Sequence, residues 1–317
     1  CGEHAFPADT GERCEKETDA LWNMRSAHSN GFRHFSTEFF STASISSKII
    51  FFSFKNELFP IFHRKETTAM MKFSCEKALL QSAIAVTSRA VAQKSSIPAL
   101  EGLLLRAGQE LTVSGYNMNT GIRTKLSAGV DEAGEIVLNA RLFGDIIRRM
   151  PDDMITFSAD ERQMVHLSCG DADFDILGLS AADYPDLPEV EDEYAVSIQQ
   201  RVLRSMIEET AFAVSTNESR PVHTGALFEI NERGLTMVAV DGFRLAVRRE
   251  PLEQLAGGAF SFVAPGAALN EVKSICSDTE DTASVTLGRR HILFEVGDTE
   301  LICRRLEGEF LDYKNAI

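Results

Sequence analysis

The sequence predicts an α+β fold of two tandem domains, each with two helices packed on antiparallel sheets. Three observations support this prediction. One order of segments occurs twice from Met71 onward, apolar residues alternate in some segments, and in others they recur every three to four residues. The repeated landmarks, Gly102 with Gly225 and Tyr184 with Tyr313, are separated by roughly the length of one domain. This spacing indicates a duplicated domain and not a short solenoid repeat.

The first predicted helix runs from Phe73 to Val91, where apolar residues recur at helical spacing. A second helix follows Asn139 and ends before Pro151, because proline cannot continue a helix. Alternation of apolar and polar residues predicts five strands. They are Leu111–Ser114, Ile122–Leu126, Met154–Ser158, Gln163–Cys169 and Asp173–Leu177.

The second copy repeats this order. Its first predicted helix carries an apolar stripe of Leu203, Met206, Ile207, Thr210 and Val214, and its second helix covers Ala267–Cys276. The strands predicted for this copy are Ala226–Ile230, Leu235–Val240, Arg244–Arg249, Ala283–Leu287, His291–Val296 and Glu300–Arg305.

The chain is expected to divide into three parts. Residues 1–70 begin without a methionine and show no sustained period, so we interpret them as an unrelated, disordered extension read from upstream of the natural start. A targeting or partner-binding segment is the alternative. Residues 71–192 form the first predicted domain and residues 193–317 the second, with an acidic, proline-bearing linker before the second. No run approaches the roughly 18 apolar residues of a membrane span.

The composition is that of a chain that can bury two ordinary cores. It has 317 residues, 44% of them hydrophobic, and a formal net charge of −15. That charge argues against a surface that is basic all over, but it is compatible with a local basic surface. The six cysteines are scattered without a CxxC pair, which favours reduced thiols over disulfides or a metal site.

The sequence lacks the motifs of common enzymes and metal sites. It has no GxxxxGK[ST] loop, GxGxxG turn, GxSxG elbow or HExxH pair. Asp171, Asp173 and Asp175 imitate the opening of a calcium loop, but Ile176 replaces the required glycine and Ala182 the closing glutamate. We therefore interpret these aspartates as an acidic strand face, and we expect no catalytic residue, metal or cofactor.

Positive charge is concentrated on the predicted helices, whereas negative charge dominates the strands and loops. Arg141 and Arg148 are one heptad apart and lie opposite the apolar stripe of their helix. Solvated helix faces would explain each helix singly, but the same bias in both copies favours one surface for duplex phosphates. The basic residues of the four helices are Lys77, Arg89, Arg141, Arg148, Arg149, Arg201, Arg204 and Lys273.

The chain from Met71 to its last residue resembles the bacterial beta sliding clamp, the processivity subunit of the replicative DNA polymerase (DNA polymerase III subunit beta). The order and spacing of short motifs carry the resemblance. The motifs are Met71-Lys72-Phe73, Ile97-Pro98 with Leu103-Leu104-Leu105, Ala182-Asp183-Tyr184-Pro185, Arg220-Pro221-Val222 with Gly225, Val238 to Val247, and Leu306 to Tyr313.

The resemblance implies three DNA-clamp domains per subunit and a head-to-tail dimer that closes a ring around duplex DNA. The helices would line the hole, in agreement with their positive charge. By position, the resemblance implies DNA contacts at Lys94, Arg148 and Asn217, with Arg149 beside them. Together with the helical residues, the predicted DNA-binding set is Lys94, Arg141, Arg148, Arg149, Arg201, Arg204, Asn217 and Lys273.

The resemblance also implies a cleft beside the second domain that takes a linear peptide from the polymerase, the clamp loader or repair proteins. His223 stands where an aliphatic residue is common in relatives. For Val240 and Leu245, ordinary strand core is the alternative. The predicted wall consists of His223, Val240, Gly242, Phe243, Arg244, Leu245, Leu311, Asn315 and Ala316.

The sequence therefore predicts a non-catalytic, sequence-independent DNA-binding scaffold of the bacterial cytoplasm, associated with the nucleoid. Two copies are seen where the family has three, so we interpret the chain as a fragment without the third domain and expect it to be a monomer. Two alternatives stay open. A nucleic-acid-processing enzyme would need clustered carboxylates for metal ions, and an adaptor built from duplicated modules would show no salt-dependent DNA affinity.

Overall fold

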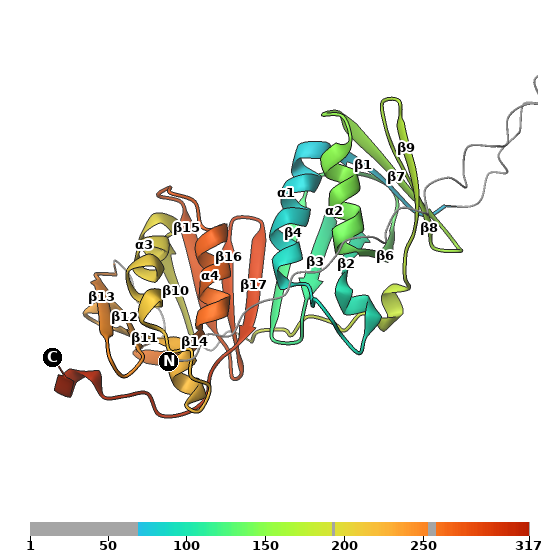
Figure 1. Cartoon of the computed structure of the whole chain (residues 1–317). Coiled ribbons are helices and arrows are strands. Elements are labelled where there is room, and N and C mark those ends of the chain that lie inside the picture. The colour runs from blue at the N-terminus through green and yellow to red at the C-terminus, as the bar shows by residue number, and fades with distance from the viewer. Residues whose placement is uncertain (1–68, 192–193, 253–257, 317) are drawn as a thin grey trace, which may run out of the picture. The chain divides into compact units, whose positions relative to one another are not determined.

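A computed structural model describes residues 69–191, 194–252 and 258–316, all of which belong to one compact unit, Arg64–Ile317 (Figure 1). The expectations for residues 1–68 lie outside the described residues. The chain builds one arrangement of strands and helices twice, and each copy contains two helices that lie side by side: α1 with α2, and α3 with α4.

The first copy begins with a strand and a helix, continues through a group of strands to its second helix, and closes with three strands. Short 3₁₀ turns follow the first helix and precede the second strand. The elements are β1 (Ala69–Glu76), α1 (Lys77–Thr87), β2 (Gly102–Ala107), β3 (Leu111–Tyr116), β4 (Thr120–Leu126), β5 (Gly129–Glu132), β6 (Gly134–Asn139), α2 (Ala140–Arg149), β7 (Met154–Asp160), β8 (Met164–Cys169) and β9 (Ala172–Leu177).

The second copy follows the same order, without a counterpart of β5 among the described residues, and ends in a short 3₁₀ turn. Its elements are β10 (Tyr194–Gln199), α3 (Gln200–Thr210), β11 (Gly225–Asn231), β12 (Gly234–Val240), β13 (Leu245–Glu250), β14 (Phe260–Pro265), α4 (Gly266–Ile275), β15 (Thr282–Leu287), β16 (His291–Val296), β17 (Thr299–Arg304) and η6 (Tyr313–Ala316).

Three antiparallel sheets connect these strands. The first has the order β5-β1-β7-β8-β9 and the third β13-β12-β11-β14. The middle sheet has eight strands in the order β10-β15-β16-β17-β4-β3-β2-β6, so it passes from the second copy into the first. The two copies are joined where β17 pairs with β4, with Leu301 opposite Ile122.

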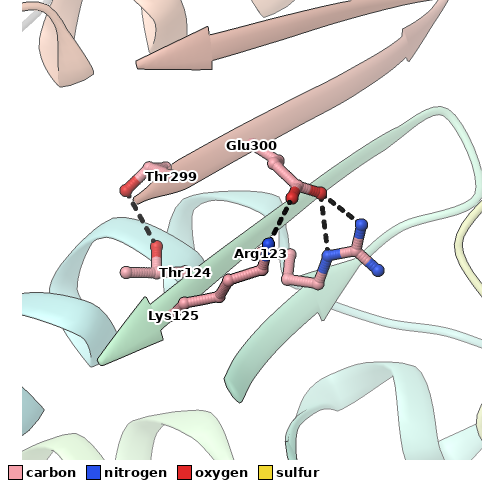
Figure 2. Close-up of polar contacts among 5 residues, drawn as sticks. All are labelled: Arg123, Thr124, Lys125, Thr299 and Glu300. Atoms are coloured by element: carbon pink, nitrogen blue, oxygen red, sulfur yellow. Dashed lines mark hydrogen bonds and ion pairs between the residues drawn. The ribbon is translucent and has the colours of Figure 1, made fainter. Parts of the chain in front are cut away.

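Polar side chains reinforce this junction on one face of the sheet (Figure 2). The carboxylate of Glu300 forms ion pairs with the guanidinium of Arg123 and, at 3.3 Å, with the ammonium of Lys125. On the opposite face, the hydroxyls of Thr124 and Thr299 lie 3.1 Å apart. Next to them on that face, Ile122 and Leu301 are buried in one apolar cluster. The strand pairing, the ion pairs and the apolar contact together hold the two copies as one sheet.

Each helix pair buries its apolar stripe against the sheets of its own copy. The first core contains Leu80, Ile84, Phe143 and Ile147, and the second contains Leu203 and other residues of α3 and α4. This burial explains why the helical periodicity was visible in the sequence: every third or fourth side chain must leave water.

The predicted helices and all of the predicted strands are confirmed, but the start of the first helix is wrong. Phe73 lies in β1, and α1 begins only at Lys77. Met71, Phe73 and Cys75 are buried and alternate with less buried neighbours, which is a strand pattern. Several strands were not predicted. They are β1, β2, β5, β6, β10 and β14.

Candidate nucleic-acid interface and partner groove

Helix α2 presents its arginines to solvent because its other side is fixed in the core. The side chain of Asn139 caps the helix by accepting a hydrogen bond from the N–H of Leu142 at 3.0 Å. Phe143 and Ile147 are fully buried. Arg141, Arg148 and Arg149, three members of the predicted DNA-binding set, are exposed.

Ion pairs within the protein neutralise part of the predicted basic surface. Arg148 pairs with Asp145, one turn earlier on α2. On α3, Arg201 lies 3.0 Å from Glu280 and Arg204 lies 3.3 Å from Glu208. Such exposed pairs contribute little to stability, about 1 kcal/mol at most, so each arginine can exchange its carboxylate for a phosphate.

Lys77 is not part of a basic surface, contrary to the count made from the sequence. Its side chain is 11% exposed, and its ammonium lies 2.6 Å from the carboxylate of Asp152. Gln200 holds the same place at the start of α3, is also buried, and accepts a hydrogen bond from the N–H of Ser277 at 3.0 Å. Both side chains therefore fasten the loop that follows the second helix of their copy.

Four members of the predicted set form no ion pair with any residue that the structure describes. They are Lys94, Arg141, Arg149 and Lys273. These are the cations with the most freedom to contact a polyanion. The unpaired basic surface is consequently smaller than the sequence pattern suggested.

Lys94 and Asn217 occupy equivalent loops of the two copies. Each lies between the 3₁₀ turn after the first helix and the next strand, and each is exposed. The loop at Lys94 is shaped by Ser95, whose N–H donates to Glu101 at 3.1 Å. The loop at Asn217 is shaped by its own side chain, which accepts from the N–H of Ser219 at 3.0 Å.

The helix pairs of the two copies meet at a direct contact. Arg89, in the turn that follows α1, lies 3.1 Å from Glu271 of α4. The exposed basic residues of α2 and α3 are therefore carried by two helix pairs that adjoin along the junction of the copies. This arrangement brings cations that are far apart in the sequence onto neighbouring helices.

The second copy has a groove on the face of its four-stranded sheet that is opposite to the helices. The groove is lined by residues of two segments, Arg220–His223 and Glu307–Asp312, and encloses about 480 Å³. The imidazole of His223 meets the ring of Phe310 edge-on, with 5.5 Å between centroids. Val222 and Phe310 join an apolar cluster with Leu245 and Leu306. The floor of the groove is thus apolar.

Burial, and then the charge of Arg220, lower the pKa of His223 below its ordinary value of 6.5. Its ring is therefore neutral at pH 7. A neutral imidazole set edge-on against a phenyl ring provides an apolar wall with one polar edge.

The turn between β12 and β13 is organised by Asp241. The carboxylate accepts hydrogen bonds from the N–H groups of Phe243 and Arg244 at 3.0 and 3.1 Å, and the guanidinium of Arg244 lies 2.7 Å from it. First the N–H of Phe243 and then the Arg244 side chain hold the pKa of Asp241 below its ordinary value. Gly242 has a φ of +90°, a backbone conformation that would be strained in a residue with a side chain. The turn leaves the ring of Phe243 100% exposed.

The structure brings together only part of the predicted cleft wall. His223 and Leu311 line the groove, and Leu245 packs on the cluster beneath it. Val240 is buried, so it supports the wall and offers little surface. Gly242, Phe243 and Arg244 form the neighbouring turn, and Asn315 and Ala316 lie in η6, where the amide of Asn315 donates to Asp312 at 2.8 Å.

Sequence reasoning missed two aromatic residues of this region. Phe310 forms part of the groove lining, and Phe212 lies under the guanidinium of Arg244, 5.8 Å from ring centre to Cζ. Phe310 stands inside the Leu306-to-Tyr313 motif, so it could have been included. No local signal joins Phe212 to Arg244, because the two are distant in the sequence.

The part of the chain that the structure describes contains no group of three or more His, Cys, Asp or Glu side chains placed to hold a metal ion. Within the same residues, no helix is both long and apolar enough to cross a membrane.

Two family profiles match the two copies. The profile of the DNA polymerase III beta subunit, N-terminal domain, matches residues 71–188, and that of its central domain matches residues 197–312. A beta sliding clamp from Staphylococcus aureus is 32% identical over 252 residues, which are 77% of this chain and 67% of the relative. The chain belongs to the beta sliding clamp family.

Solved structures of the family share the fold. The sliding clamp of Bacillus subtilis superposes with a TM-score of 0.76 at 28% identity, over 78% of this chain and 68% of the relative. The sliding clamp of Pseudomonas aeruginosa, solved bound to griselimycin, gives 0.73 at 26% identity over the same shares. The matched part of the family is its N-terminal and central domains.

Proposed function

We propose that the chain serves as a processivity factor: a scaffold that holds duplex DNA at its helices and tethers a polymerase and other partners through the groove of the second copy. The observation that carries this proposal is the pair of adjoining helix pairs with exposed basic side chains, in a chain whose relatives are described as DNA polymerase sliding clamps. The predicted DNA-binding set contains no aromatic side chain that could stack on bases. The contact would therefore be with the phosphates of the duplex.

The groove supports the tethering role. Its floor is apolar, its wall includes the neutral imidazole of His223, and the exposed turn with Arg244 stands beside it. A short peptide with leucine or phenylalanine anchors and a glutamine fits this mixture of apolar surface and hydrogen-bonding edges. The peptides would come from the replicative polymerase, the clamp loader and repair proteins.

The remaining parts of the proposal follow from the same role. A ring that encircles DNA holds it by topology, so weak contacts suffice and permit sliding. The chain would be a non-catalytic subunit acting at the bacterial nucleoid, in the cytoplasm. In the complete family ring, two subunits would associate head to tail.

Duplex binding tests the DNA half of the proposal. Titration of a fluorescent duplex should give an affinity that falls steeply with salt and does not depend on sequence. Replacing both Arg148 and Arg149 with glutamate should abolish binding, whereas Arg162→Glu, in the turn between β7 and β8, should leave it unchanged. Equal binding by all three proteins would refute the DNA-holding role.

Peptide titration tests the tethering half. Arg244→Ala and Leu245→Ala should each weaken binding of a glutamine-leucine-phenylalanine type peptide, while Arg233→Ala, in the turn between β11 and β12, should not. Unchanged affinity in both groove variants would remove the groove from the proposal without affecting the DNA result.

A further inference from the structure

Four arginines gather at one end of strands β15, β16 and β17. The turn from β15 to β16 carries Arg289 and Arg290 at its tip. Arg304 ends β17 and lies opposite His291 in the strand pairing. The next residue, Arg305, donates its N–H to the carbonyl of Arg290 at 3.0 Å. Backbone hydrogen bonds therefore hold all four arginines in one place.

These arginines lie away from the helices that carry the predicted DNA contacts. Successive side chains of a strand point to opposite faces of the sheet. Ile292 and Cys303 are buried in the core that contains α3 and α4. Their neighbours His291 and Arg304 consequently lie on the other face.

None of the four arginines forms an ion pair with a residue that the structure describes. Burial, and then the charges of Arg304 and Arg290, lower the pKa of His291 below its ordinary value of 6.5, in agreement with a positive local potential. Like charges held together repel one another. An anion that binds at this place would relieve the repulsion.

Arg289, Arg290 and Arg305 line a pocket of about 720 Å³, which we call the arginine pocket. The linker between the copies lines it as well. Val190 of the linker packs against the turn, where a Cβ on Gly288 would come within 3.0 Å of it. The linker glutamates at positions 189 and 191 form no ion pair with the arginines, so the described part of the chain leaves these cations without a carboxylate.

The arginine pocket adjoins the groove of the second copy, because Glu307 lines both. Arg305 precedes Glu307 by two residues, and an extended chain advances about 3.3 Å per residue. The pocket therefore begins roughly 7 Å from the groove. A peptide that lies in the groove can reach the pocket with an extension of about two to four residues.

We propose that the arginine pocket binds acidic side chains next to the anchors of a partner peptide, and so selects partners whose groove-binding segment has an acidic extension. The inference rests on the proposed tethering role and adds the chemistry of the partner to it. Arginine presents parallel N–H donors that match the two oxygens of a carboxylate. Because Glu307 stands between the two sites, the peptide residues that pass it are neutral or basic, and the acidic residues follow them.

A nucleic-acid strand suits this pocket less well than a peptide. A strand carries a phosphate at every nucleotide, so it would also meet the carboxylates of Glu189, Glu191 and Glu307. A peptide can place acidic side chains at the arginines and other groups at the glutamates. The mixed charge of the lining therefore favours a peptide.

Extended peptides test the inference on the whole 317-residue chain. All carry the same leucine and phenylalanine anchors and a short glycine-serine spacer. The spacer leads into three glutamates in one peptide and three glutamines in its control, and each extension is placed in turn at either end of the anchors. In fluorescence anisotropy at low salt, the glutamates should strengthen binding about tenfold at one of the two ends, and high salt should remove this gain.

Charge variants locate the effect. The double variant Arg289→Glu with Arg290→Glu should lose the gain and keep its affinity for the glutamine peptide. Arg162→Glu with Arg233→Glu is the matched control, because it reverses two exposed arginines in turns elsewhere and changes the net charge equally. This control should retain the gain.

Each contrary result has a distinct meaning. Equal binding of the glutamate and glutamine peptides at both ends overturns the inference and leaves the tethering role intact. A gain of the same size in both double variants also overturns it, since the acidic residues would then bind elsewhere. If no peptide binds, the tethering role fails and the inference fails with it. A single-stranded oligonucleotide that loses affinity in Arg289→Glu with Arg290→Glu, while the glutamate peptide keeps its gain, would assign the pocket to nucleic acid instead.

Discussion

Glu300 of β17 lies directly opposite Arg123 of β4, and their ion pair crosses the junction between the two copies (Figure 2). The Glu300 side chain is only 16% exposed and also contacts Lys125. A mostly buried carboxylate between two cations is more than a surface pair, since removing it leaves two positive charges close together in a site that is partly shielded from water.

The first prediction is that Glu300→Ala lowers the free energy of unfolding by about 1–3 kcal/mol. Arg106 and Glu135 provide the matched control, because they form a cross-strand pair at 2.9 Å that is about half exposed on both sides. Glu135→Ala should therefore cost no more than about 1 kcal/mol. Urea denaturation of the three proteins measures the difference, and equal losses would show that the junction pair is no stronger than a surface pair.

The second prediction uses the equivalence of Lys77 and Gln200. Because Gln200 performs the same fastening role without charge, Lys77→Gln should change the free energy of unfolding by no more than about 1 kcal/mol. Lys77→Glu should cost about 3 kcal/mol or more, because a buried carboxylate would face Asp152. A larger loss for glutamine than for glutamate in thermal unfolding would contradict the equivalence.

The periodicity of the sequence predicted the elements that have one solvent-exposed and one buried face, and it missed the elements that do not. Helix α2 could be predicted because Phe143, Ile146 and Ile147 are buried on one side of the helix, whereas its arginines are exposed on the other side. Strand β2 carries four consecutive buried residues, Gly102 to Leu105, and strand β6 carries three, so neither shows alternation. Strand β1 alternates, but its pattern runs directly into α1, so both were read as one helix.

The candidate sites were predictable to a different degree. Exposed arginines follow from the helix pattern, and even the pair of Asp145 with Arg148 could be expected from their spacing of three residues. The partners of Arg201 and Lys77 come from other elements, and the contact between β4 and β17 joins residues of different copies. Such partners are fixed by tertiary packing, which no local pattern contains.

The third prediction concerns the pH dependence of peptide binding in the groove. The pKa of free His223 is already lowered by burial and by Arg220, and a bound peptide would bury the ring further and lower the pKa again. Binding is then strongest above the pKa of free His223 and weakens as pH falls through it, by at most about tenfold per pH unit.

Calorimetry from pH 7.5 to about pH 5, with an amidated peptide that has no titrating group in this range, measures this effect. His223→Leu should bind with an affinity independent of pH. His291→Gln is the matched control: its pKa is also lowered, first by burial, but it lines a different groove, so the pH dependence should persist. A pH dependence that survives in His223→Leu would assign the proton to another group.

The fourth prediction separates the two neighbouring arginines of α2 by their ion pairs. Arg149 has no carboxylate partner among the described residues, whereas Arg148 must leave Asp145 before it can hold a phosphate. Arg149→Ala should therefore weaken duplex binding and reduce the slope of log affinity against log salt by about one. Asp145→Asn should strengthen binding, because it frees Arg148 and removes a negative charge from the surface.

Fluorescence anisotropy at several salt concentrations measures the duplex affinity of both variants, with Arg162→Ala as a control that removes the same charge as Arg149→Ala. If Asp145→Asn left the affinity unchanged while Arg149→Ala lowered it, Arg148 would not contact DNA, and the phosphate-binding face of α2 would be centred on Arg149.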